Sequence, residues 1–143
     1  VGRGEQEEAL GTKIKEKKLQ ERVKMAGYVP WQELPEVYAA MDAAFIAQVG
    51  NDASGRAALE AMACGLPTLA IQRGPFYETV NEARGFPIPD GQAESIAFAI
   101  KYWLDNPEKA IEVSAEAMRY IEEERTFARE ADDTLKFYET LQT

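Results

Sequence analysis

The sequence predicts an α/β domain with a mainly parallel sheet flanked by helices. Short apolar runs rich in β-branched residues alternate with stretches whose apolar residues recur at helical spacing, and short loops join them. After Asp90 the strand-like runs stop and helical stretches follow. Because 143 residues suffice for one ordinary domain, we expect a single domain, 1–143, that ends in a helical tail at 93–143.

The first part of the chain should contain the end of a strand, a helix and a second strand. Val1 and Gly2 are expected to end a strand. Residues 5–19 should form a helix, because acidic residues open it and lysines gather near its end, as the helix dipole favours. Residues 23–29 (VKMAGYV) are expected to form a strand that Pro30 stops.

The middle part predicts a helix, a strand and a second helix. Residues 31–42 have apolar side chains at helical spacing, and Tyr38 should lie on the packed face. Residues 43–49 (AAFIAQV) are mostly apolar, as in a sheet covered on both faces. The loop 50–55 (GNDASG) should then lead into a helix over 56–64, with Gly65 just beyond its end.

The last part predicts two more strands and the helical tail. We expect strands at 67–72 and 85–88, separated by a short helix at 76–83. The tail should hold three helices that cover the sheet, at 93–104, 107–124 and 126–141, and the last should have a buried apolar face.

Composition narrows the classes of function. The net charge of −9 argues against nucleic acid as a partner, although one or two cations can still bind a small phosphate. The chain has no histidine, so it can supply no histidine base or ligand, and it has no acidic pair with metal-bridging spacing. We therefore expect no metal and no cofactor.

Cysteine content and hydropathy suggest a location. The one cysteine, Cys64, has an apolar context and should be a core residue, and an intrachain disulfide is ruled out. We find no run long enough to cross a membrane. We expect a cytoplasmic protein that reaches a membrane surface only through parts outside this chain.

The stretch NDASGRAALE, residues 51–60, has the chemistry of a phosphate and polyol site. Small residues at a helix start leave backbone N–H groups open to a phosphate, and Arg56 can add a charge-assisted contact. The Glu60 carboxylate can accept hydrogen bonds from a vicinal diol such as ribose, and Asp52 can bind other hydroxyls. A phosphate flanked by two such carboxylates describes a nucleotide-sugar.

Two alternatives use the same residues differently. Arg56 and Glu60 could form only a solvated i,i+4 pair, and Asp52 or Ser54 only an N-cap. The chain would then be a non-catalytic α/β module or remnant that binds no nucleotide. A bare dinucleotide-binding domain is a weaker reading, because no G-x-G-x-x-G follows a first strand.

The run from Asp52 to Pro67, DASGRAALEAMACGLP, resembles the signature of retaining glycosyltransferases of the GT-B fold, family 4 or group 1 type. The family pattern has an acidic residue, a loop of small residues and then Glu-Ala-Met-Ala-x-Gly-x-Pro, and seven residues separate its two acidic residues, as they separate Asp52 and Glu60. Other segments resemble the family in the same order, from VGRGEQEEAL to GPFYETVNEARGFPIPDGQAESIAFAIKYWLDNPE. The resemblance implies the Rossmann-like C-terminal domain, which binds the nucleotide-sugar donor.

The resemblance assigns roles residue by residue and implies no catalytic residue in this chain. Asp52 stands where most members have Glu, and Asp reaches less far toward the sugar. The implied contacts are the donor sugar for Asp52, Ala53, Ser54 and Gly55; the diphosphate for Gly55 and Arg56; the ribose for Glu60; and the vicinity of the base for Gly27, Tyr28 and Val29.

The family also has an N-terminal acceptor domain and an opening strand that this sequence does not contain. We therefore expect a part of a longer hexosyltransferase, inactive alone, which takes a UDP-, GDP- or ADP-sugar and retains the anomeric configuration. If the protein is only this piece, the edges of the strand at 43–49 and of the first strand are unpaired, and we expect either pairing with another chain, such as self-association, or a rearranged sheet.

Overall fold

The computed structural model describes residues 1–47, 52–74 and 76–141, without the side chains of residues 52–54. The chain divides into two compact units, Val1–Val37 and Tyr38–Thr143. Each unit is described separately below.

The first unit contains helix α1 (Glu7–Glu16), the short 3₁₀ helix η1 (Trp31–Glu33) and the start of α2 (Leu34–Ala39). Helix α1 confirms the predicted helix at 5–19, with shorter bounds. Glu7 and Glu8 lie in its first turn, and Lys13 and Lys15 lie in its last turn, in the order that the helix dipole favours.

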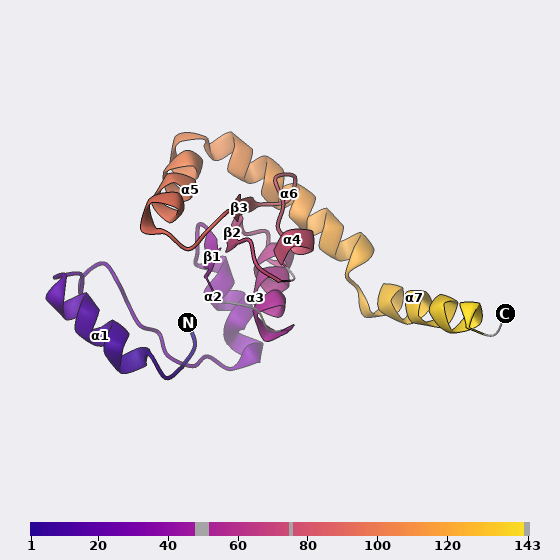
Figure 1. The fold of residues 1–143 in the computed structure, drawn as a ribbon, viewed down its shortest axis with the longest axis horizontal. Helices are drawn as coiled ribbons and strands as arrows, with labels where there is room; N and C mark the ends of the chain where they lie inside the picture. The colour runs from indigo at the N-terminus through magenta and orange to yellow at the C-terminus, as the bar shows by residue number, and fades with distance from the viewer. Residues whose placement is uncertain (48–51, 75, 142–143) are drawn as a thin grey trace. The chain divides into compact units, whose positions relative to one another are not determined.

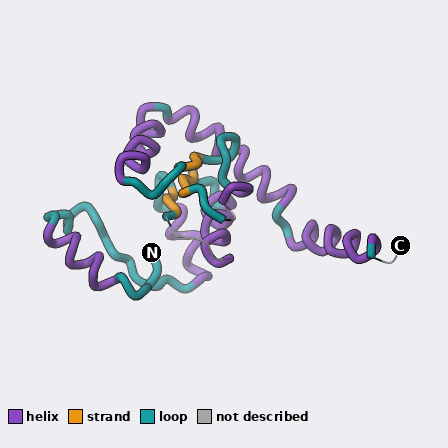
Figure 2. Tube along the Cα trace, in the orientation of Figure 1, coloured by secondary structure: helices purple, strands orange, loops and turns teal. Residues whose placement is uncertain are grey.

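The predicted strand at 23–29 is wrong: these residues run as loop (Figure 2). A strand needs a neighbouring strand to pair its backbone groups, which local apolar content cannot supply. In this unit the Gly2 N–H donates to the Gly27 carbonyl at 2.7 Å, an isolated bond without a ladder around it. The predicted strand end at Val1 and Gly2 is likewise irregular.

The second unit is built on a parallel sheet of three strands, β1 (Ala44–Ile46), β2 (Thr68–Ile71) and β3 (Phe86–Ile88), in the order β1-β2-β3. Ala44 pairs with Thr68, and Leu69 pairs with Phe86. Helices surround the strands (Figure 1). The fold confirms the predicted α/β class with a parallel sheet, and it places β1 at one edge.

Strand β2 is buried along its whole length because helices cover both faces of the sheet. Ala70 packs in a cluster with residues of α3, α4 and the C-terminal half of α6, among them Met62 and Phe76. Leu69 and Ile71 point to the opposite face and pack with Trp103 of α5 and Val113 of α6. The period-two alternation of a strand produces this division.

The helices of this unit lie close to their predicted positions. Helix α3 begins at Asp52 and not at Arg56, so residues 52–55 are helical and not a loop. A glycine in a helix costs only about 1 kcal/mol, so Gly55 does not stop it. The bounds are α3 (Asp52–Ala63), α4 (Phe76–Thr79), α5 (Ala93–Asp105), α6 (Pro107–Glu124) and α7 (Phe127–Thr140).

The tail helices differ in what they cover. Helices α5 and α6 bury Ala99, Trp103, Val113 and Ala117, which confirms that they cover the sheet. The prediction of a buried face on the last helix is wrong, because α7 has no buried residue and Phe127 is 91% exposed. Helical spacing of apolar residues identifies a face, but only a packing partner buries it.

Cys64 is exposed, which corrects its predicted place in the core. Helix α3 ends at Ala63, and Gly65 adopts a φ of +73°, the left-handed conformation that ends helices. The reversed chain buries Leu66 instead of Cys64.

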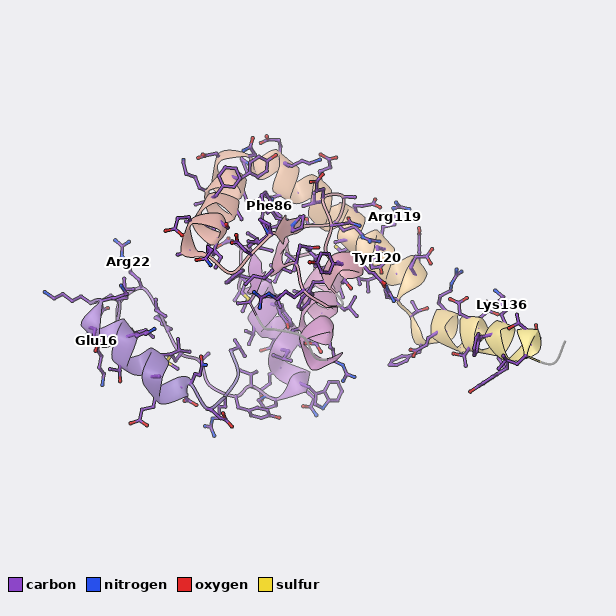
Figure 3. The ribbon with its side chains drawn as sticks, in the orientation of Figure 1. Glu16, Arg22, Phe86, Arg119, Tyr120 and Lys136 are labelled. Carbon is purple, nitrogen blue, oxygen red and sulfur yellow. The ribbon has the colours of Figure 1, made fainter. Side chains whose placement is uncertain are left out.

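An arginine-tyrosine stack lies on α6. The guanidinium of Arg84 lies 3.7 Å from the ring centroid of Tyr120, and that of Arg125 lies 5.3 Å from it. Figure 3 labels Tyr120, and also Phe86, whose ring contacts the rings of Tyr102 and Trp103 on α5.

Candidate functional site

The candidate site is centred on α3, which follows β1 in the chain. In a parallel sheet this connection places the start of the helix near the carboxyl ends of the strands, where ligands of α/β proteins bind. Residues 48–51, which include Asn51, lie outside the described residues. Asp52, Ala53 and Ser54 form the start of α3, but nothing is described of their side chains, so their predicted sugar contacts stay predictions.

Gly55 and Arg56, the residues expected to contact a diphosphate, lie in the first turns of α3. Gly55 is buried and the Arg56 side chain is exposed. An exposed guanidinium near a helix start is available to an anion. A cation there is unfavourable for the helix dipole, and the negative charge of a bound anion offsets that cost.

Glu60 lies eight residues after Asp52, which is about 12 Å along a helix axis. It is therefore two turns into α3, whereas the predicted helix over 56–64 would have placed it one turn from the helix start. Its side chain is half-buried. A carboxylate at this depth can still accept hydrogen bonds from hydroxyl groups that approach along the helix from its N-terminal end.

The partner of Glu60 in this structure is Tyr38. The Tyr38 hydroxyl donates to Oε2 of Glu60 at 3.2 Å, across 22 residues of chain. Among the ion pairs between described side chains, none joins Glu60 to Arg56. The i,i+4 pair that the alternative reading required does not form.

The Glu60 carboxylate also affects the titration of its neighbours. Burial, followed by the charge of Glu60 and the hydrogen bond to it, raises the pKa of Tyr38 to about 12. Desolvation, followed by the charge of Glu60, raises the pKa of the Cys64 thiol. The phenol therefore stays protonated, and remains a hydrogen-bond donor, throughout the physiological pH range.

A second polar side chain organises the end of β2. Gln72 follows Ile71, the last residue of that strand, and its amide nitrogen donates to the carbonyls of Phe76 at 3.3 Å and Val80 at 2.8 Å. These two bonds hold both ends of α4 beside the carboxyl end of β2. Sequence reasoning assigned no role to Gln72.

Tyr38 was expected only to pack, and no sequence signal links it to Glu60. Its helical spacing indicated an inward face, which is correct: Tyr38 packs against the small cluster of Ala44, Ala61 and Leu66. The distance in sequence hides the contact, since 22 residues of chain, including β1, separate Tyr38 from Glu60.

Gly27, Tyr28 and Val29, expected near a nucleotide base, belong to the first unit. Gly27 has a φ of +68°, a conformation that favours glycine, and the Tyr28 side chain is 68% exposed. Their proximity to a base stays a prediction.

No group of three or more His, Cys, Asp or Glu side chains in the described part of the chain is placed to hold a metal ion. None of the described helices is both long enough and apolar enough to span a membrane.

The family profile "Glycosyl transferases group 1" matches residues 1–123. The chain belongs to this family. Its relatives include a 2-deoxystreptamine glucosyltransferase of Streptomyces kanamyceticus, 31% identical over 108 residues, which are 75% of this chain and 28% of that protein. A D-inositol 3-phosphate glycosyltransferase of Kineococcus radiotolerans is 30% identical over 121 residues, 78% of this chain and 28% of that protein.

Solved structures share the fold. HepE of Anabaena, in complex with UDP-glucose, is 27% identical with a TM-score of 0.77, over 99% of this chain and 39% of that one. Sucrose-phosphate synthase of Thermosynechococcus elongatus is 22% identical with a TM-score of 0.80, over 96% of this chain and 35% of that one. The group 1 chain thus has the GT-B glycosyltransferase fold and spans about a third of the length of these proteins.

Proposed function

We propose that this group 1 glycosyltransferase chain binds the nucleotide-sugar donor of a retaining, family 4 enzyme. The observation that carries the proposal is the half-buried carboxylate of Glu60 on α3, two turns below a helix start that follows a parallel strand. A phosphate at the helix start and a ribose diol at Glu60 use both features. The complete reaction transfers a hexosyl group from the donor to an acceptor and releases a nucleoside diphosphate.

In this proposal the residue roles follow the course of α3. Asp52, with residues 53–55, contacts the donor sugar, Gly55 and Arg56 contact the diphosphate, and Glu60 binds the ribose. Gly55 and Glu60 are about 7.5 Å apart along the helix axis, a distance comparable with that between the phosphates and the ribose of one nucleotide. Gly27, Tyr28 and Val29 contribute near the base.

Uridine is the favoured base, because HepE is similar to this chain and its structures contain UDP and UDP-glucose. A further domain outside this chain supplies the acceptor site, which is consistent with the share of the relatives that the chain spans. The outer edge of β1 pairs with a strand outside this chain, or with a second copy of it.

Calorimetric titration with UDP, GDP and ADP tests the donor site, in the protein as its gene encodes it. We expect UDP to bind, and Glu60→Ala to weaken binding at least tenfold, on the order of a lost charge-assisted hydrogen bond. Glu122→Ala, which removes an exposed carboxylate from α6, is the matched control and should bind as wild type. Absence of binding by all three nucleotides at millimolar concentration would favour the non-catalytic module.

Further measurements address the finer points. Repeating the titration with EDTA and with Mg²⁺ tests whether donor binding needs a metal. Retention is tested by NMR of the glucose that the protein releases from UDP-α-glucose, before that sugar equilibrates between its anomers. A retaining enzyme releases the α-anomer first, and the β-anomer as first product would contradict the proposal. Sedimentation velocity reports whether the protein self-associates.

A further inference from the structure

The hydrogen bond between Tyr38 and Glu60 joins two elements on opposite sides of β1 in the chain. Tyr38 lies on α2, before the strand, and Glu60 lies on α3, after it. The bond is therefore a tertiary contact and not a consequence of one helix's periodicity. It fixes one oxygen of the carboxylate on which the proposed donor site depends.

The phenol ring is itself held in place. It packs against the cluster of Ala44 in β1, Ala61 in α3 and Leu66 after α3, which are 5%, 0% and 6% exposed. Ala61 is the residue next to Glu60, so part of the surface that holds the ring lies on the same helix as the carboxylate that accepts its hydrogen bond. A hydrogen-bond donor that is held in place in this way reduces the number of side-chain rotamers open to Glu60.

A carboxylate has about four lone-pair positions on two oxygens. Tyr38 takes one of them, on Oε2. No other described side chain donates to Glu60, so Oε1 and the second lone pair of Oε2 are open to other donors as far as the described residues show, and a vicinal diol presents two hydroxyl groups. The geometry points to Tyr38 as a positioning residue that orients Glu60 to accept both ribose hydroxyls of the donor nucleotide; this inference rests on the proposed function.

The phenol can perform this task at any physiological pH, because a tyrosine keeps its proton there, and burial with the adjacent carboxylate raises the pKa of Tyr38 further. It neither contacts nor reacts with the donor. It acts through Glu60 by limiting the orientation of the carboxylate, and the cost of losing it should appear only when the ligand has a diol to bind.

The test is calorimetric titration of the protein as its gene encodes it with UDP and with 2′,3′-dideoxyuridine diphosphate. Tyr38→Phe keeps the ring and its packing and removes only the hydroxyl. We expect it to weaken UDP binding about three- to tenfold, the effect of one hydrogen bond, and to leave binding of the dideoxy nucleotide unchanged. Tyr102→Phe on α5, on the other face of the sheet, is the control and should bind both nucleotides as wild type.

A double-mutant cycle completes the test. Adding Tyr38→Phe to Glu60→Ala should cause no further loss of UDP affinity, because the group through which Tyr38 acts is gone. Circular dichroism spectra and thermal unfolding show that each variant is folded.

The outcomes separate this inference from the proposed function. UDP binding that is equal in wild type and Tyr38→Phe overturns the inference and leaves the proposed function standing. A loss of affinity in Tyr38→Phe that is equal for UDP and for the dideoxy nucleotide also overturns the inference, because it would assign Tyr38 a packing role only. If the wild-type protein binds no nucleotide, the proposed function fails and the inference fails with it.

Discussion

Gly85 lies very close to the backbone of β2. It precedes β3 and is buried. A Cβ at this position would lie 2.5 Å from the carbonyl oxygen of Thr68 and 2.8 Å from Cγ1 of Val80. The first distance is about 0.9 Å shorter than the 3.4 Å at which ordinary contact begins. Gly85→Ala should therefore destabilise the protein.

The magnitude depends on what can move. Thr68 opens the central strand β2, pairs with Ala44 and is fully buried, so its carbonyl cannot retreat without shifting a strand that is paired on both sides. Overpacking of a core by one methyl group typically costs about 1–3 kcal/mol. Because one of the two clashing atoms belongs to the backbone, we expect the upper end, about 3 kcal/mol, a large share of an ordinary domain's stability of roughly 5–15 kcal/mol.

Urea unfolding followed by circular dichroism measures the free energy of unfolding of wild type and Gly85→Ala. Gly91→Ala is the matched control, because its Cβ would meet Cδ1 of Ile71 at 3.6 Å, an ordinary contact. The control should be neutral or slightly more stable, since alanine restricts the unfolded chain. A loss below about 1 kcal/mol in Gly85→Ala would refute the reasoning that the strand cannot yield.

Three further predictions concern the region around Glu60. The pKa of Tyr38 rises from 10.0 to about 12, so its contribution to stability is fully present below pH 10 and is lost as the pH rises toward 12. Such a shift corresponds to about 2.7 kcal/mol of stability, which solvent screening reduces to about 1 kcal/mol. The difference in unfolding free energy between wild type and Tyr38→Phe, measured from pH 8 to 11.5, should therefore shrink by about 1 kcal/mol. A difference that stays constant with pH would contradict this prediction. Glu60→Gln should lower the pKa of Cys64 and speed its alkylation at pH 8 about twofold, and an unchanged rate would mean that the charge does not reach the sulfur. Gly65→Ala should lower the free energy of unfolding by about 1 kcal/mol, measured by thermal unfolding, because the φ of residue 65 is +73°. The added Cβ would lie 2.9 Å from Sδ of Met118, but this flexible side chain can move away. A stabilised variant would contradict the prediction.

The candidate site was only partly accessible from the sequence. The alternation of small, charged and apolar residues from 51 to 65 predicted α3, its end at Gly65 and a carboxylate at Glu60. The same pattern could not reveal that Glu60 bonds to Tyr38 and not to Arg56, because the choice depends on how α2 packs against α3. Gln72 was missed for the same reason, since its partners are the carbonyl groups of Phe76 in α4 and of Val80 just after it, and no sequence pattern links them to Gln72.

By itself, the sequence determined the local elements of the second unit. Apolar spacing, prolines and glycines act over a few residues, and they placed β1, β2, β3 and helices α3 to α6 close to their observed bounds. Tertiary structure alone decided which of these patterns found a partner. Residues 23–29 have the composition of a strand but no ladder, and α7 has an apolar face that no described residue buries, because pairing and burial are properties of two surfaces and a sequence pattern specifies only one.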